Sequence, residues 1–140
     1  MGAIDLVTNP NKDLGLSGTP HQASATFTTD DYTTAEDCLG YTGVLAVISS
    51  VAITDGQPWV WSLYECDTSD GTFTAVSDVT GVASFTNAED NKDKFIYGNI
   101  TMRYVKLKHD QTSASSGAVF SARLIKFGAA HKPVNATGTV

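Results

Sequence analysis

The sequence predicts an all-β protein, an antiparallel β-sandwich of jelly-roll-like design with about eight strands and an extended arm at each end. About thirty of its 140 residues are Ser or Thr, and Thr favours strands while Ser favours turns. Short segments rich in branched and aromatic residues recur at roughly 8–12-residue spacing between turn signals. No long segment shows the helical period of 3.6 residues; residues 31–39 allow one helical turn at most.

The first third of the chain contains an arm and three predicted strands. Residues 1–22 are rich in Gly, Pro, Asn and Thr, which favour turns, so they predict an N-terminal arm or long loop. Residues 23–28 alternate small or polar with apolar side chains and predict a strand. Residues 38–41 predict a short strand that ends among glycines. Residues 44–53 are apolar on both faces, which predicts a central strand.

The middle of the chain predicts a hairpin. Residues 59–66 are dense in aromatic and branched side chains and predict a strand. Residues 67–71 are turn formers that end in Gly71, which is able to adopt a left-handed conformation. Residues 72–76 then predict the returning strand.

The remaining segments are predicted from polarity and alternation. Residues 77–94 are polar and predict a loop in which Phe85 is the apolar anchor. Val105 and Leu107 alternate with Lys106 and Lys108, which predicts a strand with one buried and one solvated face. The predicted later strands are 94–97, 102–108 and 118–127. The sandwich domain is therefore expected to span residues 23–128, followed by a C-terminal tail at 129–140.

Charge is distributed unevenly along the chain. Residues 1–91 carry thirteen carboxylates and one lysine, a net charge of −12, whereas residues 92–140 carry eight Lys or Arg and two Asp, a net charge of +6. Opposite potentials on different surfaces would favour oriented self-association. In the alternative, strands from the two parts interleave and the charges mix.

The overall composition argues against several kinds of partner. With a net charge of −6 and a pI of about 4.7, the chain is not expected to bind nucleic acid, which requires a clustered basic surface. The N-terminus has neither a basic nor an apolar segment of the secretory type, so no secretory signal is expected. The longest apolar run is too short to cross a bilayer, so no membrane partner is expected.

No pattern of catalytic or metal-binding residues emerges. Cys38 and Cys66 have no further Cys or His at zinc-ligand spacing, and they are expected to be free, partly buried thiols. His109 precedes Asp110, but neighbours in a strand face opposite sides, so His109 is expected at an exposed strand end. Residues 67–71 resemble the start of a calcium loop but lack the distal Glu. We therefore expect no enzymatic activity, no metal and no cofactor.

Trp59 and Trp61 lie two positions apart and therefore share one face of a strand. Buried, they would belong to the core, which is the favoured interpretation. Exposed, they would form a platform for carbohydrate.

Several motifs in residues 54–134 occur in an order that resembles the jelly-roll cement, or decoration, proteins of bacteriophage capsids. An apolar strand precedes Thr-Asp-Gly at 54–56, and a hairpin carries Ser-Asp-Gly-Thr-Phe at 69–73. Arg-Tyr-Val follows at 103–105, the last strand ends in Lys-Phe-Gly at 126–128, and an extended His-Lys-Pro follows at 131–133. The opening Ile-Asp-Leu at 4–6 is also similar to the start of that family.

The resemblance implies a structural virion protein on the outer capsid surface that stabilises contacts between subunits of the major capsid protein. It also implies self-association as a dimer or trimer on a capsid symmetry axis. The arms are the implied contact regions, and the contact residues expected in them are Ile4, Leu6, His131, Lys132 and Pro133. The alternatives are a carbohydrate-binding jelly-roll module of a virion or host surface, and a neck or tail component.

Overall fold

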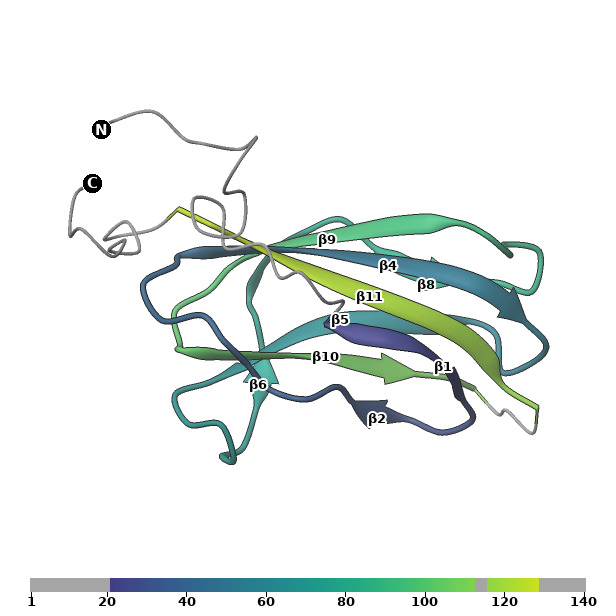
Figure 1. Cartoon of the computed structure of the whole chain (residues 1–140), viewed down its shortest axis with the longest axis horizontal. Coiled ribbons are helices and arrows are strands. Elements are labelled where there is room, and N and C mark those ends of the chain that lie inside the picture. Colours follow the sequence, from purple (N-terminus) through teal and green to yellow (C-terminus); the bar gives the residue numbers. More distant parts are fainter. Residues whose placement is uncertain (1–20, 113–115, 129–140) are drawn as a thin grey trace.

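The protein is an antiparallel β-sandwich, as the sequence predicts. The computed structural model describes residues 21–112 and 116–128. Figure 1 shows two stacked sheets with no helix between or beside them. The described residues form eleven strands rather than about eight: β1 (Gln22–Phe27), β2 (Asp31–Tyr32), β3 (Glu36–Asp37), β4 (Gly43–Ile53), β5 (Trp59–Cys66), β6 (Thr74–Ala75), β7 (Asp78–Thr80), β8 (Ala83–Phe85), β9 (Asp93–Asn99), β10 (Tyr104–Asp110) and β11 (Ala118–Phe127).

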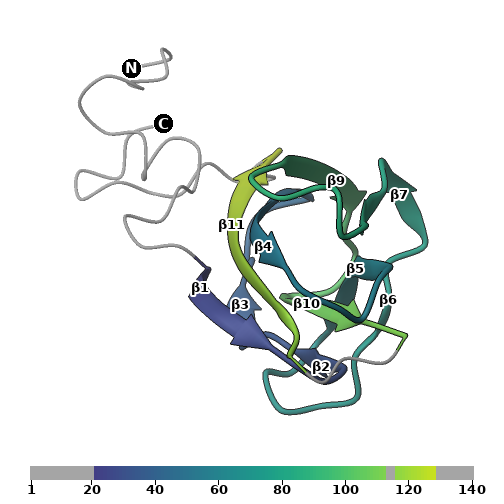
Figure 2. The ribbon, with the colours of Figure 1, turned by 90° about the vertical axis from the view of Figure 1, so that its right-hand side faces the viewer.

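The chain crosses repeatedly from one sheet to the other, which gives the jelly-roll-like topology. One sheet has five strands in the order β1-β11-β4-β9-β7. The other has six, along the path β2-β10-β5-β6, with β3 beside β10 and β8 beside β5. Figure 2 shows the two layers end-on, with β1 beside β11 at the margin where the chain descends to β2.

The central position predicted for residues 44–53 is confirmed. β4 pairs with β11 on one side and with β9 on the other. Val44, Ala46 and Ile48 are buried, while the alternate residues Leu45 and Val47 are only partly buried. β4 therefore buries one face in the core and turns its second apolar face outward.

A layer of aromatic rings fills the space between the sheets. Phe120 of the five-stranded sheet packs against Trp59, Trp61 and Phe85 of the six-stranded sheet, with ring centroids 5.7, 5.3 and 5.1 Å away. All four side chains are buried. Phe85 is thus the anchor that the sequence predicts, and the favoured core interpretation of the two tryptophans is confirmed.

The extra strands are short. β2 and β3 lie in residues 31–39, where one helical turn at most was expected, and the other two lie in the expected loop. β7 and β8 fall inside residues 77–94, and each contains three residues. Such short strands carry too few residues to display an alternating pattern, so polarity alone misassigned them. The strand expected at 38–41 is also wrong: Cys38 follows β3, and its backbone N–H bonds to the Arg103 carbonyl.

Gly71 ends the hairpin turn for a different reason from the one expected. It does not adopt a left-handed conformation. A Cβ atom at this position would lie 2.6 Å from Cys66 Sγ and would collide with Thr68 Oγ1. The glycine is needed there because the turn folds tightly onto its own side chains.

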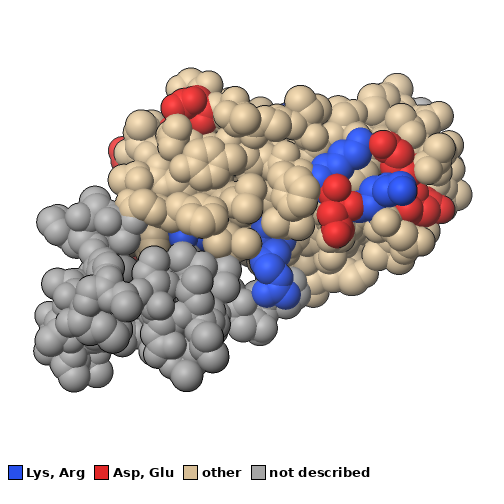
Figure 3. Space-filling view, turned by 90° about the horizontal axis from the view of Figure 1, so that it is seen from above, with Lys and Arg blue, Asp and Glu red and all other residues tan. Residues whose placement is uncertain are grey.

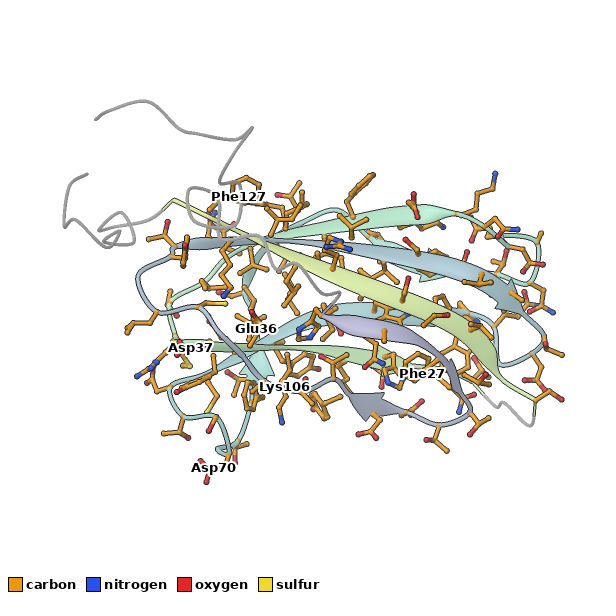
Figure 4. The ribbon with its side chains drawn as sticks, viewed as in Figure 1. Phe27, Glu36, Asp37, Asp70, Lys106 and Phe127 are labelled. Carbon is orange, nitrogen blue, oxygen red and sulfur yellow. The ribbon has the colours of Figure 1, made fainter. Side chains whose placement is uncertain are left out.

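Charges from the two parts of the sequence mix at one end of the sandwich. Arg103 bonds to Asp37 at 2.8 Å, and Lys126 approaches Glu36 at 3.0 Å. Figure 4 shows Glu36 and Asp37 side by side there. The interleaved arrangement is therefore confirmed at this end, because β3 lies beside β10 and near the end of β11.

Glu65 is a buried carboxylate that fixes the turn before β10. It accepts hydrogen bonds from the Thr101 backbone N–H at 2.8 Å, the Thr101 hydroxyl at 3.1 Å and the Met102 N–H at 3.2 Å. Because the Glu65 side chain is buried, it accepts these three hydrogen bonds in place of water, and its removal leaves the turn without its acceptor.

We expect Glu65→Ala to lower the free energy of unfolding by about 3 kcal/mol, since it removes a buried, charged hydrogen-bond acceptor. Urea denaturation monitored by tryptophan fluorescence measures the change. Asp67→Ala, at the exposed start of the adjacent turn, is the matched control and should change it by less than about 0.5 kcal/mol. Equal effects of the two substitutions would contradict the role given to Glu65.

Candidate binding surfaces

The contact residues predicted in the two arms, Ile4, Leu6, His131, Lys132 and Pro133, lie outside the described residues. Their attachment points are nonetheless defined. β1 begins at Gln22, which pairs with Ala122 of β11, and β11 ends at Phe127. The segments 1–20 and 129–140 therefore continue from neighbouring strands of the five-stranded sheet.

The two tryptophans do not form a platform for carbohydrate. Trp59 is 0% exposed and Trp61 is 2% exposed. The Trp59 indole N–H donates to the Asp55 carbonyl at 2.8 Å. The alternative in which these rings bind sugar is therefore wrong, because both rings are buried in the aromatic layer and are not accessible to a ligand.

His109 is in the core, not at an exposed strand end as expected. It is 2% exposed, and its ring lies 4.4 Å from Phe27 and 5.0 Å from Trp61 between centroids. The alternation of buried Val105 and Leu107 continues to His109 because β10 extends to Asp110. Continuing the two-residue period by one step would have found this position. The separate prediction that His109 and Asp110 face opposite sides is confirmed, since the Asp110 carboxylate pairs with Lys108.

Both cysteines are buried and free, as the sequence predicts. Burial raises the pKa of the Cys38 thiol to about 12, which keeps it protonated and unreactive at neutral pH. In the described part of the chain, no group of three or more His, Cys, Asp or Glu side chains is placed to hold a metal ion. Over the same residues, no helix is long and apolar enough to span a membrane.

The outward face of the five-stranded sheet carries an apolar patch across β11, β4 and β9. Leu45 lies between Ile125 and Tyr97 in register, and the next outward position, Val47, lies between Arg123 and Phe95. Phe95 is 55% exposed. Figure 3 views this face and shows uncharged side chains over most of it, with a cluster of charged side chains at one end and a few more elsewhere on the face. We define the apolar patch as Leu45, Val47, Phe95, Tyr97, Ile125 and Phe127.

A hollow of about 220 Å³ adjoins the apolar patch, lined by Val47, Ser49, Ser121, Ala122 and Arg123. It combines an aliphatic wall with two hydroxyls and a guanidinium. The patch is therefore a broad apolar area with a small polar depression next to it.

The outward face of the six-stranded sheet has a different character. The rings of Tyr32 and Tyr64 meet edge-to-face with centroids 5.4 Å apart. The Lys108 ammonium lies 5.9 Å from the Tyr32 centroid and 5.8 Å from that of Tyr64. The Lys106 ammonium lies 5.8 Å from the Tyr32 centroid and 4.4 Å from that of Phe73. Aromatic rings and lysines therefore alternate across this face.

A pocket of about 250 Å³ opens in this second face, lined by Tyr32, Gly71, Thr72, Phe73 and Lys106. Its walls come from β2, from β10 and from the segment between β5 and β6. No pattern in the sequence indicates this pocket, because Tyr32 and Phe73 lie about forty positions apart and line one pocket only when β2 and β5 flank β10.

Burial of the His21 and His109 side chains predicts a fold that is sensitive to acid. Burial lowers the pKa of His109 and that of His21 below the ordinary value of 6.5, although Glu36 partly opposes the effect at His21. His109 Nδ1 has no hydrogen-bond partner among the described residues, so protonating it adds an unsatisfied buried N–H. The unfolded chain takes up these protons at higher pH than the folded chain does.

We therefore expect the free energy of unfolding to be constant above about pH 7 and to fall as the pH drops below 6.5, by at most about 1.4 kcal/mol per pH unit for each histidine. Urea midpoints measured from pH 8 to pH 5 test this. His109→Phe should reduce the slope over that range and leave the contribution of His21. An unchanged slope in His109→Phe would show that His109 is not responsible.

Comparison with known proteins does not extend these observations. No protein-family model matches the chain, and no curated protein matches it. The likeness to phage cement proteins therefore rests on the sequence motifs alone. A proposal about function depends on those motifs and on the two surfaces.

Proposed function

We propose that this protein is a structural component of a bacteriophage virion that binds the outside of the capsid and stabilises contacts between major capsid protein subunits. The observation that carries the proposal is the apolar patch on the five-stranded sheet. The resemblance of the hairpin, the Arg-Tyr-Val strand and the C-terminal motif to cement proteins supports it independently.

The apolar patch is suited to a protein partner on energetic grounds. Burying a large apolar side chain contributes about 1.5–3 kcal/mol, and Phe95 still has 55% of its surface exposed. The patch lies on three strands whose opposite faces are locked into the core, so docking requires little ordering of the surface. A rigid sheet face of this kind binds without moving parts.

The polar border supports orientation of the partner. Arg123 lies beside Val47 in register, and the adjoining hollow adds the hydroxyls of Ser49 and Ser121. Polar groups at the rim of an apolar area favour a partner with complementary polar groups. We propose that the major capsid protein supplies groups that complement the two serine hydroxyls.

The undescribed segments are the second part of the proposed contact. Residues 1–20 and 129–140 continue from β1 and β11, the two strands on one side of the five-stranded sheet. We propose that these segments contact neighbouring subunits through Ile4, Leu6, His131, Lys132 and Pro133. Many symmetric copies, arranged as dimers or trimers, would make individually weak contacts strong together.

We expect the purified protein to bind emptied, expanded heads of its phage at a fixed number of copies per capsomer. The double variant Val47→Lys/Phe95→Lys should weaken this binding at least about a hundredfold, because two charges would have to be desolvated in the interface. Co-sedimentation with heads, quantified by gel densitometry, measures both properties.

Val82→Lys is the matched control, since Val82 is 74% exposed but follows β7 at the edge of the sandwich, outside the apolar patch. It should bind heads like the unmodified protein. Absence of binding by the unmodified protein would overturn the proposed function. Equal binding by the double variant and the control would overturn the role of the patch.

A further inference from the structure

The pocket on the six-stranded sheet faces away from the proposed capsid-binding surface. Figure 4 shows Lys106 and Asp70 on this side of the molecule and Phe127, a member of the apolar patch, on the other. A protein bound through the five-stranded sheet therefore leaves this pocket in contact with solvent. Its chemistry points to a ligand of its own.

The positive charge in the pocket is not neutralised by an ion pair. Lys108, two positions along β10, pairs with Asp110 at 2.9 Å. Among the described residues, Lys106 forms no such pair, and the partners of its ammonium are the rings of Phe73 and Tyr32. Lys106 is also half-buried, so its attraction for an anion is screened less than that of a fully exposed lysine.

The walls of the pocket suit a ring-shaped ligand with hydroxyl groups. Tyr32 is 39% exposed and presents an aromatic surface on which the C–H face of a sugar ring can pack. Thr72 and the Gly71 backbone line the same pocket and provide hydrogen-bonding groups. A volume of about 250 Å³ matches one small ring rather than an extended ligand.

The charges on segments that reach the pocket disfavour a polyanion. Asp31 and Asp70, both exposed, immediately precede the pocket residues Tyr32 and Gly71, and the whole chain carries a net charge of −6. A ligand with several phosphates or several acidic side chains would be repelled by the net negative charge of the protein. A single carboxylate on a polyhydroxylated ring matches the one ammonium of Lys106 and the hydroxyl of Thr72 in the pocket lining.

From these observations we propose that the pocket formed by Tyr32, Thr72, Phe73 and Lys106 binds an acidic sugar residue of a glycan. The ligand carboxylate pairs with the Lys106 ammonium, and the sugar ring packs against Tyr32. This site goes beyond the proposed function and does not depend on it, since the two surfaces belong to opposite sheets. It also differs from the tryptophan platform considered from the sequence, whose rings are buried.

Titration of the isotope-labelled full chain with D-glucuronic acid and with N-acetylneuraminic acid, followed by amide chemical-shift changes, tests the proposal. We expect at least one of the two to bind with a dissociation constant of about 1 mM, the range reached by single-residue ligands of this size. The shifted amides should cluster at residues 31–33, 71–73 and 105–107. D-glucose, which lacks the carboxylate, should bind at least about tenfold more weakly.

Lys106→Met keeps the apolar stem of the side chain and should weaken binding of the acidic sugar at least about tenfold, while Lys106→Arg should retain binding. Lys92→Met removes an exposed lysine next to β9 of the other sheet and is the matched control, with unchanged binding expected. The amide spectrum of each variant reports whether it is folded. Tyr32→Ala, which removes the ring and not the charge, should also weaken binding.

Three results would overturn the proposal: no shift changes with either acid, equal binding of glucose and the acids, or tighter binding of a glutamate tripeptide than of either sugar. Equal affinity of Lys106→Met and the unmodified protein would show instead that Lys106 only bridges Tyr32 and Phe73. Head binding by Lys106→Met should be unchanged, so failure of this site and failure of the proposed function are distinguishable.

Discussion

The packing of aromatic rings between the two sheets is the interaction on which the rest of the structure depends. Phe120 of β11 lies among Trp59, Trp61 and Phe85, and Phe27 extends the layer to His109. Large rings fix the separation and the register of the sheets, because a close-packed interior tolerates neither a gap nor an overlap. The strands that carry these rings therefore present their other faces to solvent in fixed positions.

The two outward faces that result are chemically different. On the five-stranded sheet, Leu45, Val47 and Phe95 form part of an apolar patch, which suits a broad contact with another protein. On the six-stranded sheet, Lys106 and Tyr32 line a small pocket between strands. The proposed capsid contact and the proposed sugar site would therefore use opposite faces of the sandwich.

Charge in this protein acts locally. The acidic first part and the basic second part of the sequence meet in ion pairs such as Asp37 with Arg103 and Glu36 with Lys126. The hydrogen bond from Arg103 lowers the pKa of Asp37. Both ion pairs link β3 to its neighbours. Lys106, without such a pair among the described residues, keeps a charge that is available to a ligand.

The sequence by itself determined the fold class, the long strands and the central place of β4, because alternation and turn residues act over a few neighbouring positions. It also determined that Val105 and Leu107 face inward. Only the tertiary structure decided the burial of His109, the short strands β7 and β8, and the pocket that joins Tyr32 to Phe73. These depend on which distant strands become neighbours, and no local pattern encodes pairing between positions far apart in the chain.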